Sequence, residues 1–526
     1  MSLQLILNRF TNNFPTTEDS KRLEYIRLRE FLFKGENSKV FLDDLLIRLC
    51  AAGVSYKEFI PNSVNHLYRS HSPNSAVGRS RVEAMLRSYN LLKPICSVKN
   101  RFLFGDKIIC KDADDNRNMW LNGTEDRPDD GFVDRINLYT ELSKSALGGQ
   151  YRGDSIIKLW RNEDKQAQLS IISAKYWFPV AYIEDNKKVL ANCIVEEYKD
   201  KRNMNKSQNG TKCEDDIIYK ITASEKGVTY YFAVEKKDEK LTIIEYDEVL
   251  LGMLPAGKSK AEMENVWKED TQLDYPVIFR VPTIPCDDSI YGTTDFDDAC
   301  ISQFREIFIR MTQNSRIIDR NTDPLMVGPA GFRSEDENGQ EVVETSGKYM
   351  AVDKEDADLK YVEFGGEMLT KSKEIIKEAI ESIYGMTNVN ASALGSTQEG
   401  LSALSGTAIE KVYATPIAEG NRQWQLWNPI IKDIIKCARQ LEVGVNDAMP
   451  EIGRESGLPK TDMEKIEVML AKNGNQPVIS QLESIRQSNA GISNDDALKL
   501  QAMILQEQKD REGIEPIDDN NIEFGE

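Results

Sequence analysis

Residues 295–320 read DFDDACISQFREIFIRMTQNSRIIDR, and residues 367–385 read EMLTKSKEIIKEAIESIYG. In both stretches apolar residues recur every three or four positions, which is the spacing of one face of an α-helix. We therefore expect two long amphipathic helices. Their apolar stripes are Ile301, Phe304, Ile307, Phe308, Met311 and Ile318 in the first, and Ile375, Ile376, Ala379, Ile380 and Ile383 in the second.

A short segment rich in turn residues separates these two helices. Residues 321–364 contain Asp323-Pro324 and Asn338-Gly339 among short apolar runs. An Asn-Gly pair between such runs is typical of a β-hairpin. We expect an antiparallel helix pair that holds a small module at its tip.

A polar connection follows the second helix. Residues 386–405 are rich in Gly, Ser and Asn, and a loop of about twenty residues between helices is uncommon and usually functional. A third long helical pattern occupies residues 406–441. Pro416 and Pro429 lie inside it, so we expect this helix to kink or break at the prolines.

The first 293 residues contain helical patterns and β-strand patterns. Helices are expected at 19–33, at 41–52 and at 134–147, the last one stopped by Gly148-Gly149. Residues 100–116 are expected to form a short strand interrupted at Gly105.

The segment from 153 to 250 has a β pattern. Its runs of Ile, Val, Tyr and Phe are separated by polar turns, which favours an antiparallel meander over parallel βαβ units. The polar residues 200–216 are expected to be an exposed hairpin loop.

Composition limits the function. The chain has 526 residues, with 67 Lys and Arg against 86 Asp and Glu, so its formal charge is −19. Such a charge argues against static binding of nucleic acid through a broad basic face. No apolar run is long enough for a transmembrane helix, and the start, MSLQLILNRF, lacks the features of a secretory signal.

Candidates for catalysis are few. The chain has eight Cys without a CxxC pair and two His, so we expect no metal site, no cofactor and no catalytic group. One motif stands apart: residues 252–259, GMLPAGKS, match the G-x-x-x-x-G-K-[ST] pattern of a phosphate-binding P-loop. Antiparallel surroundings argue against that interpretation, which remains an alternative in which Lys258 would reach phosphates and Ser259 would bind Mg²⁺.

Four segments resemble one family. They are SYNLLKPICSVKNRFLFGDKII (88–109), YGTTDFDDACISQFREIFIRMTQNSRIIDRNTDPLMVGPAG (291–331), ESIYGMTNVNASALGSTQEGLSALSGTAIEKVY (381–413) and ISQLESIRQSNAGISNDDALKLQAMILQEQ (479–508). In their order and spacing they resemble the portal, or head-to-tail connector, proteins of tailed double-stranded DNA bacteriophages.

The resemblance implies an α+β portal fold assembled as a ring, typically of twelve subunits. The implied parts are a wing at 1–293, a stem helix at 294–320, a clip at 321–364, a second stem helix at 365–385, a tunnel loop at 386–405, a kinked wing helix at 406–454, and a crown with an acidic tail at 455–526.

The implied function is a channel at one capsid vertex for packaging and ejecting double-stranded DNA, without sequence preference and without enzymatic activity. Implied partners are the terminase large subunit, head-completion or adaptor proteins, and the major capsid and scaffolding proteins. The implied location is the virion, and the host cytoplasm during assembly, with no membrane. Another structural virion protein, such as a capsid or tail adaptor, remains a further alternative.

The resemblance also assigns roles to residues. The tunnel-loop candidates for lying against DNA are Asn388, Asn390, Ser392, Gly395, Ser396, Thr397, Gln398 and Gly400. Stem candidates for facing the channel are Lys371, Lys373 and Lys377, and clip candidates are Asp323, Pro324, Asn338 and Gly339.

Overall fold

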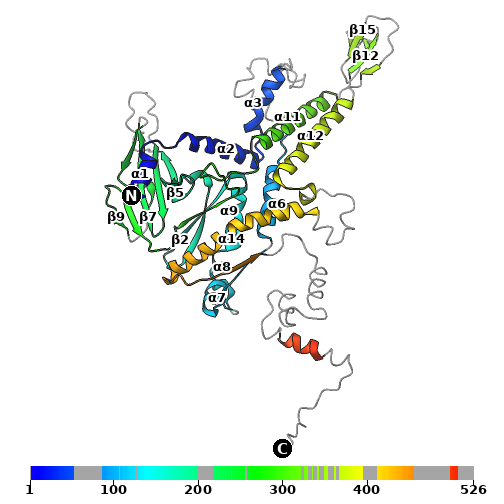
Figure 1. Ribbon diagram of the computed structural model, residues 1–526. Helices are drawn as coiled ribbons and strands as arrows, with labels where there is room; N and C mark the ends of the chain where they lie inside the picture. The colour runs from blue at the N-terminus through cyan, green and yellow to red at the C-terminus, as the bar shows by residue number, and fades with distance from the viewer. Residues whose placement is uncertain are drawn as a thin grey trace, which may run out of the picture.

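The computed structural model shows a mixed α and β body from which a pair of helices projects (Figure 1). The two helices carry a small β-module at their far end. The residues that the structure describes are 2–51, 86–105, 107–124, 127–199, 217–237, 240–254, 258–321, 325–329, 334–335, 341–342, 349–352, 360–362, 366–394, 412–454 and 498–506.

Three helices begin the chain: α1 (Ser2–Thr11), α2 (Thr17–Phe33) and α3 (Ser38–Ala51). The last two confirm the helices expected at 19–33 and 41–52. Helix α2 begins with a capping box, in which Thr16 accepts from the backbone of Asp19 and the Asp19 carboxylate accepts from the backbone of Thr16. This exchange satisfies two groups that a helix start leaves unpaired.

The strand expected at 100–116 is only partly correct. Residues up to Phe104 belong to helix α6 (Leu92–Phe104), which ends at Gly105 with a positive φ of 66°. Strand β1 (Ile108–Lys111) follows and pairs with β17 (Glu451–Arg454). The run NRFLF is helical because Phe102, Leu103 and Phe104 continue the buried side of a helix that begins upstream.

The helix expected to stop at Gly148-Gly149 runs through both glycines. After α7 (Asp115–Asn122), η3 (Pro128–Asp130) and α8 (Phe132–Arg135), helix α9 extends over Leu138–Arg152. A Cβ atom at Gly149 would meet the Ser155 hydroxyl at 2.2 Å. The glycine therefore permits close packing of helix on strand instead of ending the helix.

The β segment is antiparallel, as expected, but it forms two sheets instead of one meander. The smaller sheet has the order β11 (Ile278–Pro282), β2 (Asp154–Arg161) and β3 (Ala167–Ile172). Short helices η4 (Ala174–Tyr176) and α10 (Glu248–Leu251) lie between strands of the β region. The larger sheet has the order β4 (Val180–Ala181), β5 (Val189–Lys199), β6 (Ile217–Glu225), β7 (Val228–Lys237), β10 (Trp267–Asp270) and β9 (Ser259–Lys260), with β8 (Lys240–Ile244) also pairing with β7.

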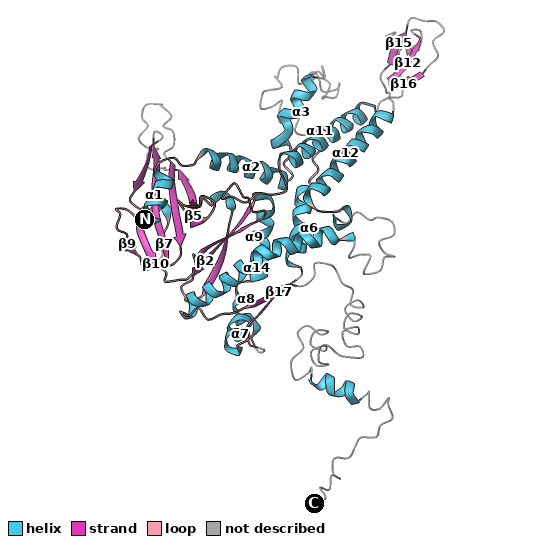
Figure 2. Ribbon diagram, viewed as in Figure 1, coloured by secondary structure: helices cyan, strands magenta, loops and turns pink. Residues whose placement is uncertain are grey.

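Both sheets bury one face under helices (Figure 2). Helix α1 covers the larger sheet, with Ile6 and Phe10 packed against Phe232 and its neighbours. The smaller sheet packs against the long helix α14 (Ala414–Val443) through Trp427 and Ile434. The hairpin loop expected at 200–216 lies outside the described residues.

The projecting pair consists of α11 (Asp298–Asn321) and α12 (Gly366–Thr387), which confirms the two amphipathic helices. Between them, β12 (Leu325–Pro329) lies between β15 (Tyr349–Val352) and β16 (Lys360–Val362). Strands β13 (Ser334–Glu335) and β14 (Glu341–Val342) pair antiparallel on either side of the Asn-Gly step, in agreement with the expected hairpin.

The helical pattern is interrupted just before Pro416, since Val412 is helical, Tyr413 lies in a turn and α14 begins at Ala414. At Pro429, by contrast, α14 continues without a break. Pro416 lies in its first turn, where backbone N–H groups have no partner within the helix. Pro429 lies inside the helix, between buried residues Trp427 and Ile431 that hold it on the body. Residues 406–411, 455–497 and 507–526 lie outside the described part of the chain. The described residues 498–506 are helical. None of the described helices combines the length and apolar character needed to cross a bilayer.

Candidate functional site: the projecting helices and the junction at their base

Helices α11 and α12 are held together by an apolar seam. Phe304, Ile307 and Phe308 of α11 are buried in one cluster with Ala379 and Ile383 of α12. Helix α12 leaves its other face exposed, whereas most described side chains of α11 are buried or half-buried because α11 also contacts α3. The pair is a rigid support for the module between its ends.

The entry to α11 depends on two glycines. Gly153 and Gly292 face each other so closely that a Cβ atom on Gly153 would meet the Gly292 carbonyl oxygen at 2.3 Å. The Gly292 N–H donates to the Asp154 carboxylate at 3.0 Å, and Asp297 caps α11 by accepting from the Cys300 N–H at 2.9 Å. These contacts set the point from which the pair leaves the body.

The exposed face of α12 carries charges of both signs. The Lys371 ammonium lies 2.7 Å from Glu367, and that of Lys377 lies 3.7 Å from Glu381. Lys373 is exposed as well, and forms no ion pair with another described residue. This face carries three lysines and four glutamates: Lys371, Lys373, Lys377, Glu367, Glu374, Glu378 and Glu381. The three predicted lysines are all exposed, but the exposed surface of α12 is not basic.

The start of the predicted tunnel loop is tied to the body. Asn388 is exposed, with a positive φ of 56°. The Asn390 side chain donates to the Val412 carbonyl and accepts from the Ala393 N–H at 2.9 Å. The Ser392 carbonyl accepts from the Tyr413 hydroxyl at 3.3 Å. Asn390 thus joins the end of α12 to the residues just before α14.

Other predicted residues lie outside the part that the structure describes. For the tunnel loop these are Gly395, Ser396, Thr397, Gln398 and Gly400, and for the clip they are Asp323, Pro324, Asn338 and Gly339.

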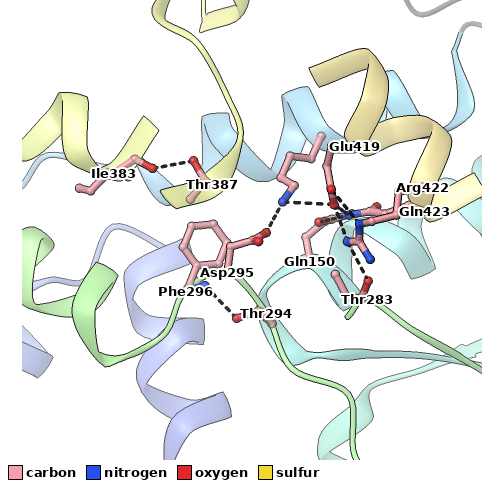
Figure 3. Close-up of polar contacts among 11 residues, drawn as sticks. Gln150, Thr283, Thr294, Asp295, Phe296, Ile383, Thr387, Glu419, Arg422 and Gln423 are labelled. Atoms are coloured by element: carbon pink, nitrogen blue, oxygen red, sulfur yellow. Dashed lines mark hydrogen bonds and ion pairs between the residues drawn. The ribbon is translucent and has the colours of Figure 1, made fainter. Parts of the chain in front are cut away.

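A buried polar cluster lies where the helix pair meets the body (Figure 3). We call it the Lys99 junction. The Lys99 side chain on α6 is only 2% exposed. Its ammonium forms an ion pair with Asp295, just before α11, and lies 3.8 Å from the carboxylate of Glu419 on α14. One buried cation therefore links three elements distant in sequence.

Glu419 is the most heavily bonded member of the junction. Its oxygens accept from Arg422 at 2.6 and 2.9 Å and from Gln423 at 2.8 Å, and Gln423 in turn bonds Gln150 of α9. Burial alone would raise the pKa of Glu419, but the donors of Arg422 and the charge of Lys99 outweigh it and hold the pKa below its ordinary value. The carboxylate remains ionised at neutral pH.

The junction also requires close contact between two helices. A Cβ atom at Gly420 of α14 would lie 2.3 Å from the Phe102 carbonyl oxygen of α6. Only glycine allows this crossing. The beginning of α14 is therefore fixed on α6 by shape as well as by charge.

Sequence reasoning missed the residues of the Lys99 junction. A signal was present on α6, where Lys99 lies on the side that also carries the buried residues Ile95, Cys96 and Phe102. A charged residue on an apolar helix face indicates a buried partner. No local sequence pattern identified Asp295 and Glu419 as the partners of Lys99.

The P-loop-like segment lies in a different setting from that of a P-loop. A short helix, α10, precedes it in place of a strand, and the strand β9 follows in place of a helix. The Lys258 ammonium lies 3.8 Å from the centre of the Tyr231 ring, and burial lowers the pKa of this lysine to about 8. A P-loop binds phosphate at the start of the helix that follows it, and no helix begins at Ser259.

Within the described ranges, no group of three His, Cys, Asp or Glu residues is placed to hold a metal ion. A scan against models of known protein families finds no match to this chain, and neither does a search of curated proteins.

Proposed function

We propose that this chain is a portal protein of a tailed double-stranded DNA bacteriophage, the subunit of a ring through which DNA enters and leaves the capsid. One observation carries the proposal: an antiparallel helix pair leaves an α/β body, bears a small β-module at its tip and returns through a polar segment into a long helix (Figure 1). This succession of parts is the one that the sequence resemblance implies.

The charge pattern of α12 supports a sliding contact with DNA. A face with three lysines and four glutamates has no net positive charge. Phosphate contacts dominate the affinity of proteins for DNA, so a surface of this kind would hold the duplex weakly. With a formal charge of −19 per chain, the proposed channel lets DNA pass without retaining it.

The Lys99 junction supports a role for the helix pair as a fixed arm. It links the entry of α11 to the start of α14, on either side of the proposed clip, stem and tunnel loop. A subunit of a ring needs such a connection so that force on the loop or the clip reaches the body.

In this proposal the β-module between α11 and α12 is the clip, where the terminase large subunit binds during packaging and head-completion or adaptor proteins bind afterwards. The body is the wing, in contact with major capsid and scaffolding proteins. The protein is then a component of one capsid vertex, assembled from twelve copies as the resemblance implies.

A packaging reaction with the cognate motor and proheads tests the function. We expect proheads built with a chain that lacks residues 395–402 to package much less DNA, because the segment proposed to lie against the duplex is missing. The deletion spares Asn390 and Ser392, which bond to residues next to α14. Proheads that package full-length DNA with the deleted chain would contradict the role of the loop.

A further inference from the structure

A pocket of about 280 Å³ opens on the larger sheet, away from the helix pair. Buried Phe14, Phe178, Val195 and Tyr219 form its apolar base. Its remaining lining residues are Pro15, Leu23, Lys175, Tyr176 and Glu197. A pocket of this size accommodates one bulky side chain and is smaller than most sites for drug-sized ligands.

One wall of the pocket is the edge of strand β5. Strand β4 pairs with β5 only at Val189 and Ala191, and a single bridge joins Trp177 to Ile194. Beyond Ile194, no described strand pairs with β5 on this side, whereas β6 pairs with its other side throughout. The edge beside the pocket is therefore open among the described residues.

The direction of the free backbone groups follows from the pairing. The Cys193 carbonyl points to this edge, because it accepts from the Phe178 N–H at 2.9 Å. Backbone groups of a strand point to the same side at every second residue. The carbonyl of Val195 and both backbone groups of Glu197 therefore point to the open edge. The side chains of Val195 and Glu197 also line the pocket.

We propose that this edge and pocket together bind an extended segment of a partner protein, which adds to β5 as a further strand. Strand addition combines main-chain hydrogen bonds at an open edge with a pocket for alternate side chains. Both features occur here on the same two residues, Val195 and Glu197. The inference is independent of the portal proposal, since it concerns a different part of the molecule.

The lining residues specify the chemistry of the segment. Side chains directly opposite each other on paired strands lie on the same face. The residue opposite Val195 enters the aromatic base and should be bulky and apolar. The residue opposite Glu197, two positions away, meets an exposed carboxylate that has no ion pair with another described residue, and should be Lys or Arg.

Labelled peptides test this binding mode. The probe is fluorescein-labelled Thr-Thr-Lys-Thr-Phe-Thr-Thr, ordered for antiparallel addition, and its reversed sequence tests parallel addition. Fluorescence anisotropy with the full chain should show binding of one of the two with a dissociation constant on the order of 100 μM. Absence of binding by both peptides at about 1 mM would overturn the proposal.

Variants locate the site. Tyr176→Ala should weaken binding about tenfold by removing part of the pocket wall. Tyr182→Ala is the matched control, because both tyrosines are 40% exposed and Tyr182 does not line the pocket. Glu197→Lys should weaken binding of the Lys peptide and strengthen binding of the same peptide with Glu in place of Lys. Equal binding by all four proteins would contradict the assignment.

Backbone methylation separates strand addition from simple occupation of the pocket. Two further peptides carry N-methyl groups on alternate backbone amides. One is methylated at the odd-numbered positions and the other at the even-numbered positions. Only one set points toward β5 in a paired strand, so one peptide should lose binding and the other should retain it. Retention by both would show that the main chain makes no contact, and would overturn strand addition.

Discussion

The lysines of α12 and the lysine of the Lys99 junction all lie on helices but differ in burial. Lys377 has a side chain that is 78% exposed and lies 3.7 Å from Glu381 on the same helix. Lys99 is 2% exposed and links residues from two other elements. Exposed pairs contribute little to stability, whereas a buried charge without its partner is costly. The first region can meet a passing ligand, and the second fixes the fold.

The largest expected effect follows removal of the buried cation. Lys99→Met keeps much of the side-chain volume but leaves Asp295 without its buried partner. We expect the free energy of unfolding to fall by about 3–5 kcal/mol, measured by urea denaturation. Lys373→Met on the exposed face of α12 is the control and should change it by less than about 0.5 kcal/mol. Equal effects of the two variants would remove the distinction between the regions.

Close packing at the same junction gives the next effect. Gly420→Ala would place a methyl group 2.3 Å from the Phe102 carbonyl oxygen and force α14 away from α6. We expect a loss of about 3 kcal/mol of unfolding free energy.

Gly385→Ala in α12 is the matched control, because a Cβ atom there has no neighbour within 4 Å. It should stabilise the chain by up to about 1 kcal/mol. A tolerated Gly420→Ala would show that the crossing is looser than the structure indicates.

The acid response of the junction is a third effect. The pKa of Glu419 lies below its ordinary value of 4.5 in the folded chain, so its ionised form stabilises the fold above that pH. Glu419→Gln should cost about 2 kcal/mol at pH 7. The difference between the two proteins should shrink as the pH falls below about 4.5. A difference that stays constant down to pH 3 would show that ionisation of Glu419 does not contribute.

The smallest effect is expected on the exposed helix face. Lys377→Ala should change the free energy of unfolding by less than about 0.5 kcal/mol, because its ion pair with Glu381 is exposed and screened by salt. Thermal unfolding at low and high salt measures this. A larger, salt-sensitive loss would mean that the surface pairs of α12 act as a network.

The local periodicity of apolar residues was sufficient to predict the two projecting helices. The stripes containing Phe304, Phe308 and Ile383 lie in the seam between α11 and α12, because a three-and-four spacing places residues on one helix face wherever the helix lies. The same reasoning failed at Gly149, and no break occurs at Pro429. A glycine can serve close packing as well as helix termination, and Pro429 lies between buried residues that hold the helix on the body.

The Lys99 junction could not be predicted in the same way. Lys99 and Asp295 are 196 positions apart, and no local pattern specifies which of 86 acidic residues meets a buried lysine. The strands of residues 153–250, expected to form one meander, belong to two different sheets for the same reason. Pairing between distant segments depends on the whole fold.

Electron microscopy of the purified chain tests the central claim most directly. The portal proposal predicts closed rings with an axial hole, with the helix pairs of neighbouring subunits arranged around it. Micrographs that contain single, separate chains and no rings at micromolar concentration would contradict the proposal.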